Sequence, residues 1–118
     1  MSATVFLSMA KAIQYLGDAA GAQQLLATLN NTLETEVPQI SAAIEHQNFE
    51  TLQKIWHQLK GFAPVFCHDA LVIEIKRTEG LCKHIESPDL QAAALQASAA
   101  LLANLKLLQS EVQRQLAA

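Results

Sequence analysis

The sequence has little of what a β-rich fold requires. Its 118 residues include only 4 glycines and 3 prolines, too few for the many turns of a β-sandwich or barrel. Aromatic residues make up 5% of the chain, whereas alanine and leucine, two of the best helix formers, contribute 20 and 18 residues. The sequence therefore predicts an all-α protein, and its length fits one domain over residues 1–118.

Charge is scarce too, and this excludes several classes of partner. Charged residues account for 16% of the chain and the net charge is −3, so the basic excess that binds nucleic acid is missing. No apolar run approaches the roughly 18 residues that a membrane span needs. The first residues lack the basic and then apolar pattern of a secretory leader. With two cysteines, too few for a disulfide framework, we expect a cytoplasmic protein without membrane or nucleic-acid partners.

Helical periodicity runs through the chain between short polar connections. The first predicted helix covers Thr4–Leu16, and the capping residues Asp18, Asn48, Asp69 and Ser87 begin the other four. The long segments carry apolar residues at the i, i+3, i+4, i+7 spacing of one buried face. Four long amphipathic helices with short connections predict an antiparallel up-down four-helix bundle, with the short additional N-terminal helix covering one end.

One proline falls inside the second predicted helix. Pro38 removes a backbone hydrogen bond there and is expected to kink the helix. The apolar stripe keeps its phase across the proline, so we predict one bent helix and not two.

The third predicted helix carries a histidine on the side opposite its core. About 100° per residue places the core residues between roughly 160° and 240° from His57 on the helical wheel. They are Leu52, Ile55, Leu59, Ala63 and Phe66. A neutral imidazole near pH 7 is a good nucleophile for a phosphoryl group. Lys60 can offset the charge of a phosphorylated ring, and Gly61 leaves the surface beside the ring bare. On the wheel alone, an ordinary surface histidine beside an ordinary lysine is the competing interpretation.

The residues His57-Gln58-Leu59-Lys60-Gly61 resemble the H-x-L-K-G signature of histidine phosphotransfer (HPt) domains, the family found in bacterial multistep phosphorelays. The likeness extends in order and spacing over roughly residues 4–116. The matching segments are Gly17-Asp18, Ala42-Ala43-Ile44-Glu45, Asn48-Phe49, the signature itself and Leu71 to Glu79.

The resemblance implies a phosphorelay intermediate of two-component signal transduction. In that family the histidine receives a phosphoryl group from the aspartate of one receiver domain and passes it to the aspartate of another. His57 matches the phosphoacceptor, and Lys60 and Gly61 match the residues that support the phosphohistidine and clear space for the receiver. Glu79 matches a Gln or Glu on the adjacent helix, and Gln53 is a second supporting candidate on the face of His57.

The resemblance also sets what the domain lacks and whom it meets. Such a domain is a phosphocarrier and not an enzyme, it holds no cofactor, and the Mg²⁺ belongs to the receiver. The expected partners are response-regulator receiver domains and a hybrid sensor histidine kinase, met by a monomer. Candidates for the docking surface are Phe49, Lys54, Pro64 and Val65. The chain departs from the family pattern near this surface, with Phe62 in place of a small residue and Cys67 in place of a glycine.

A different class of function stays open. The bundle could bind receivers or other helices without being phosphorylated, and nothing on the helical wheel separates that interpretation from phosphotransfer. The sequence also fits either a free-standing protein or one domain of a hybrid kinase.

Other residues point to structural roles. A zinc site built from Cys67, His68, Cys82 and His84 is not expected, because these pairs lack the usual two-to-four-residue spacer between ligands. Cys82 lies on an apolar stripe and is predicted to be a small core residue. Trp56 is predicted to be a half-buried packing residue, since a lone aromatic in an acidic chain makes a poor nucleic-acid site.

Overall fold

Five helices make up the fold in a computed structural model, which describes residues 4–118. They are α1 (Met9–Leu16), α2 (Ala19–Glu45), α3 (Phe49–Phe66), α4 (Asp69–Lys83) and α5 (Pro88–Ala117). Within these described residues, the only strand-like pairing is an isolated antiparallel bridge between Leu7 and Cys67. The prediction of an all-α protein is confirmed. Residues 1–3, which the sequence analysis assigns to the same domain, lie outside the described part.

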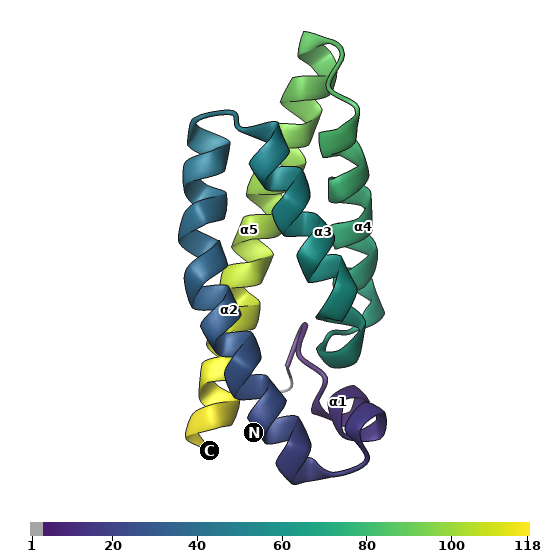
Figure 1. Ribbon diagram of the computed structural model, residues 1–118, viewed down its shortest axis with the longest axis vertical. Helices are drawn as coiled ribbons and strands as arrows, with labels where there is room; N and C mark the ends of the chain where they lie inside the picture. The colour runs from purple at the N-terminus through teal and green to yellow at the C-terminus, as the bar shows by residue number, and fades with distance from the viewer. Residues whose placement is uncertain (1–3) are drawn as a thin grey trace.

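The long helices lie side by side and share one apolar core. Figure 1 shows α2, α3, α4 and α5 along the long axis of the molecule, with α1 at one end. α3 packs against α2 and α4, α5 packs against α2 and α4, and α1 packs against α2 and α3. Leu26, Leu52, Ile75 and Leu105 are fully buried, one from each long helix. This arrangement is compatible with a helical bundle.

Within residues 4–118, no helix is both long and apolar enough to cross a bilayer.

Three of the predicted caps begin helices as expected. The side chains of Asp18, Asn48 and Ser87 each accept a hydrogen bond from the backbone N–H three residues further on. The prediction that Asp69 caps the fourth helix is wrong. Asp69 is the first residue of α4, and His68 occupies the N-cap position without a side-chain hydrogen bond. The Asp69 carboxylate instead accepts from the Nζ of Lys11 on α1, at 3.1 Å.

The first helix is shorter than predicted. The sequence predicted a helix over Thr4–Leu16, but α1 begins at Met9 and is 8 residues long. The backbone N–H groups of residues 5–7 donate to the carboxylate of Glu111 on α5. Because these groups are satisfied by a distant side chain, the segment stays non-helical until Ser8 caps the helix.

The second helix runs through its proline. α2 is one helix of 27 residues with Pro38 inside it, which confirms the prediction of one helix over two. Pro38 is exposed, while Leu33 and Ile40 on either side are buried. The helix therefore loses a hydrogen bond on its solvent side only, where water can replace it.

Trp56 fixes the rotation of α3 in the core. The prediction of a half-buried ring is wrong, because Trp56 is 0% exposed. Its Nε1 donates to the Oγ of Ser98 on α5 at 3.2 Å, and a satisfied indole N–H allows the whole ring to be buried. Cys82 Sγ lies 3.6 Å from the same hydroxyl, as expected for a small core residue. With this face of α3 buried, its opposite face is held toward solvent.

Candidate functional site

His57 lies on the outer face of α3. Its side chain is 63% exposed, whereas Leu52, Ile55, Leu59 and Phe66 of the same helix are buried. The prediction that the histidine and these apolar residues occupy opposite faces is confirmed. The imidazole is therefore open to a partner and attached to a helix whose rotation is fixed by core packing.

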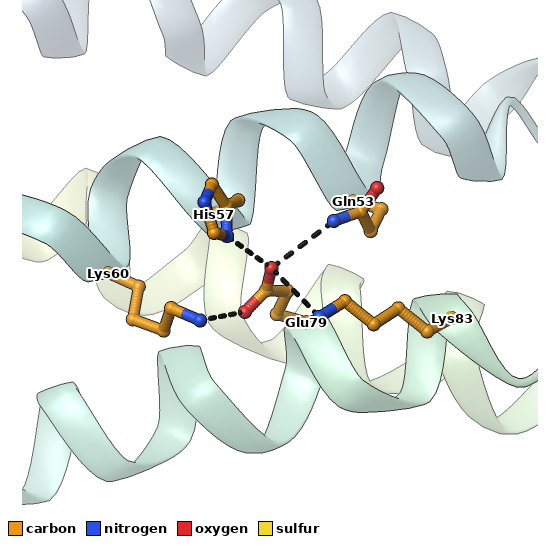
Figure 2. A network of polar contacts seen from close by, with 5 residues as sticks. All are labelled: Gln53, His57, Lys60, Glu79 and Lys83. Carbon is orange, nitrogen blue, oxygen red and sulfur yellow. Dashed lines mark hydrogen bonds and ion pairs between the residues drawn. The ribbon is translucent and has the colours of Figure 1, made fainter.

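The contacts of His57 converge on a buried carboxylate of α4. Glu79 is 3% exposed, and its Oε2 lies 2.8 Å from Nδ1 of His57. The same oxygen accepts from Nε2 of Gln53 at 3.2 Å, and Nζ of Lys83 lies 3.6 Å from it. The other oxygen, Oε1, accepts from Nζ of Lys60 at 2.7 Å. Figure 2 shows these four side chains, from α3 and α4, gathered around Glu79.

The charge of Glu79 determines which nitrogen of His57 carries a proton. Burial raises the pKa of Glu79, but hydrogen bonds from Lys60, His57 and Gln53 outweigh it and lower that pKa to about 2. The carboxylate is thus ionised at neutral pH and can only accept hydrogen bonds. Nδ1 of His57 must then be the donor. In the neutral ring this leaves the lone pair on Nε2, the nitrogen that Figure 2 shows on the side away from Glu79.

The resemblance assigned Lys60 to a phosphorylated ring and Glu79 to the vicinity of the histidine. The structure brings His57, Lys60, Glu79 and Gln53 into one network, with Lys60 bonded to Glu79 in the unmodified protein. Four of the five predicted acceptor and supporting residues therefore lie in one network, and the fifth, Gly61, follows Lys60 on α3.

Gly61 leaves open surface beside this network. A Cβ placed on Gly61 meets no atom within 4 Å, so internal packing does not require a glycine. A glycine inside a helix costs about 1 kcal/mol relative to alanine. Within the described fold, no packing contact at Gly61 offsets this loss of helix stability. The glycine leaves the backbone of α3 exposed one turn after His57.

The four candidates for partner docking differ in exposure. Lys54 is exposed and pairs with the glutamate one turn earlier at 3.3 Å. Pro64 is exposed and lines a shallow groove that also includes Tyr15 of α1. Phe49 and Val65 are half-buried and pack against the core. Lys54 and Pro64 are thus fully presented to solvent, and the two apolar residues present only an edge.

Sequence reasoning missed one member of the network, Lys83. It stands four residues after Glu79 on α4 and is 49% exposed. A Glu followed by a Lys at i+4 on a helix is a recognised favourable pair, and this spacing was the available signal.

The other exposed histidines lack such an environment. His84 is the nearest equivalent, because its Nδ1 lies 3.7 Å from a carboxylate oxygen of Glu86. Both partners of that pair are 71% exposed, so solvent competes for the contact. His57 therefore differs from His84 in having a buried, charge-balanced acceptor.

The two cysteines are free, buried thiols. Both are buried, and burial raises the pKa of the Cys67 thiol to about 12 and raises that of Cys82 as well. A thiol binds metal as the thiolate, which such burial disfavours. In the described part of the chain, no three metal-capable side chains gather into a possible site.

No family model, curated protein or solved structure matches the chain.

Proposed function

We propose that this chain is a histidine phosphotransfer domain, in which His57 accepts a phosphoryl group from one receiver-domain aspartate and passes it to another. The observation that carries the proposal is the pairing of an exposed imidazole with a buried, ionised carboxylate at 2.8 Å. That pairing supplies a nucleophilic Nε2 in a fixed direction. It is supported by the H-x-L-K-G residues, of which His57, Lys60 and Gly61 lie within about one turn of each other on α3.

The chemistry requires few groups from this chain. The lone pair of Nε2 attacks phosphorus, the bond from phosphorus to the aspartate oxygen breaks, and its electron pair stays on the aspartate carboxylate. The ring becomes positively charged while Nδ1 keeps its proton, and the neighbouring Glu79 carboxylate stabilises that charge. The reverse reaction delivers the phosphoryl group to the second receiver. The receiver supplies Mg²⁺ and the remaining groups, so the chain acts as a phosphocarrier and not as an enzyme.

The proposal includes a fold and a location. The four long helices would form the antiparallel up-down four-helix bundle of such domains, with α1 covering one end. The domain would act as a monomer in the cytoplasm, between response-regulator receiver domains and a hybrid sensor kinase. A receiver would approach over Gly61 and Pro64, with Lys54 and the edges of Phe49 and Val65 at its margin.

The test is transfer from a phosphorylated receiver domain. The full chain is incubated with a receiver carrying labelled phosphate on its aspartate, and the product is analysed for phosphate that is labile in acid and stable in base. The wild type is expected to become labelled on His57. His57→Gln should abolish labelling and leave the fold intact, because the glutamine amide can still donate a hydrogen bond to Glu79.

His84→Gln is the matched control, since it removes an exposed histidine that also faces a glutamate through Nδ1. This variant should be labelled like the wild type. Label retained in His57→Gln would assign the acceptor to another histidine. A wild type that binds receivers without taking up label would instead support the alternative, a receiver- or helix-binding bundle that is not itself phosphorylated.

A further inference from the structure

The two oxygens of Glu79 have unequal surroundings. Among the described residues, Oε2 is contacted by His57, Gln53 and Lys83, whereas Oε1 is contacted by Lys60 alone. The two cations also differ in how firmly they are held. Lys60 is 2.7 Å from its oxygen and 30% exposed, and Lys83 is 3.6 Å from its oxygen and 49% exposed.

The cations reach the carboxylate from opposite sides. Figure 2 shows Lys60 arriving from α3 on one side of Glu79 and Lys83 arriving along α4 on the other. The free ring nitrogen of His57 lies on the side of Lys60 in the same view. Lys60 also follows His57 by three residues on the same helix, a spacing that places two side chains as neighbours. A phosphoryl group on Nε2 would therefore lie on the side of Lys60 and away from Lys83.

Moving Lys60 to that group would leave one oxygen of Glu79 without its ammonium, while the other oxygen stays bonded to Nδ1 of the charged ring. Oε1 of Glu79 would lose the one partner it has among residues 4–118, although the side chain is 3% exposed. A buried carboxylate oxygen without a hydrogen-bond donor is unfavourable, and this would oppose the movement of Lys60. Lys83 can remove the cost, because its ammonium already lies near the carboxylate without being closely bonded to it.

On the basis of the proposed function, we propose that Lys83 is a positioning residue that takes over Glu79 when Lys60 turns to the phosphoryl group on His57. In the unmodified protein Lys60 forms the close ion pair with Glu79, and the Lys83 ammonium lies nearby at a longer distance. In the phosphorylated protein Lys83 closes on the carboxylate, and the bond between Glu79 and Nδ1 is kept. The network would thus exchange one cation for another while the imidazole stays in place.

The experiment phosphorylates His57 without a partner protein. Potassium phosphoramidate transfers its phosphoryl group to imidazoles, and its own P–N bond breaks with loss of ammonia. The acidity of the phosphoryl group on His57 is then followed by the change of its ³¹P shift with pH. A nearby ammonium stabilises the dianion, so the second acid dissociation constant reports whether Lys60 has reached the group.

Four variants separate the roles of the lysines. Lys60→Met removes the cation that faces the phosphoryl group. In Lys83→Met no second lysine can replace Lys60, so Lys60 should stay paired with Glu79 and not reach the phosphoryl group. Each is expected to lower the dissociation constant about threefold, the effect of a partly exposed ion pair. The double variant should be no lower than Lys60→Met alone. Lys76→Met, at an exposed position of α4 outside the network, is the control for loss of one charge and should have a smaller effect.

A second measurement excludes a merely structural role. The ¹⁵N shifts of the unmodified His57 ring should show a protonated Nδ1 in Lys83→Met as in the wild type, because Lys60 still holds Glu79. Equal dissociation constants in Lys83→Met and Lys76→Met would overturn the inference. Additive effects in the double variant would also overturn it, since Lys83 would then contact the phosphoryl group directly.

The proposed function fails separately. If phosphoramidate modifies His57 but a phosphorylated receiver does not, the relay role is wrong and the cation exchange is still decided by the variants. If phosphoramidate does not modify His57, both proposals are overturned.

Discussion

Glu79 and His57 join opposite environments across 2.8 Å: the carboxylate is 3% exposed and the imidazole is 63% exposed. Because the carboxylate is buried, water has little access to it. Its hydrogen bond to Nδ1 therefore holds the exposed ring in a fixed direction. At His84 both partners are exposed and 3.7 Å apart, and no such constraint acts on the ring. Burial of the acceptor, more than the presence of a glutamate, distinguishes the candidate site.

Glu79→Gln should slow phosphoryl transfer. The amide lacks the charge that holds Nδ1 as a donor and stabilises the phosphorylated ring, and a hydrogen bond to a charged group contributes about 1.5–3 kcal/mol. We expect a loss of at least about tenfold in the transfer rate. The ¹⁵N shifts of His57 should show more of the tautomer protonated at Nε2. Glu86→Gln is the control, and an unchanged rate in Glu79→Gln would contradict the role given to the carboxylate.

Acid should destabilise the protein partly through Glu79. Its pKa is lowered from 4.5 to about 2 in the folded state, so the unfolded chain binds the proton more readily. The resulting stabilisation is complete above pH 4.5 and is lost as pH falls toward about 2. Denaturant unfolding at a series of pH values should therefore give a steeper loss of stability in this window for the wild type than for Glu79→Gln. Identical slopes would show that Glu79 is not held in its charged form.

Substitutions of Gly61 should distinguish an effect on helix stability from an effect on the access of a partner to His57. Gly61→Ala should raise the free energy of unfolding by about 1 kcal/mol, because the added Cβ meets open space. Gly61→Arg should also keep the fold, yet it places a long side chain beside His57 and should slow transfer sharply. Comparing receiver affinity with transfer rate shows whether docking or chemistry is lost. Transfer at the wild-type rate in Gly61→Arg would mean that the receiver approaches over another face.

Glu111 should be essential for holding residues 5–7 against the bundle. Its carboxylate accepts from the backbone N–H groups of Phe6 and Leu7, each at 3.0 Å, and from that of Val5. Glu111→Ala leaves these donors unpaired and should lower the free energy of unfolding by about 1–3 kcal/mol. Glu45→Ala, at an exposed position, is the control in the same thermal or denaturant unfolding experiment. A loss no greater than that of the control would show that the segment is held by other contacts.

Local signals in the sequence predicted most of the fold. The caps at Asp18, Asn48 and Ser87 act within three residues, so they could be identified without a structure. The failures came from distant partners. Asp69 is bonded to Lys11, 58 residues away, and Trp56 is buried because Ser98, 42 residues away, accepts its N–H. The hydrophobic periodicity of a helix carries no information about partners so far away in the sequence.

The candidate site was predicted in the same uneven way. The helical wheel placed His57 outward because burial follows the period of the helix, and family resemblance brought in Glu79. Neither source indicated that Glu79 is a shared acceptor for Lys60 and Lys83, because that depends on how α3 and α4 pack. The distances in this network decide which nitrogen of His57 is free, and they required coordinates.

The non-helical segment held by Glu111 also bears on the order of folding. Its hydrogen bonds join residues 104 to 106 positions apart, so the segment leaves the ribosome long before its acceptor is made. Closing so long a loop is entropically unfavourable until the intervening helices have packed. Among the described residues, this early segment is thus among the last to reach its native place, because its docking needs Glu111 of α5.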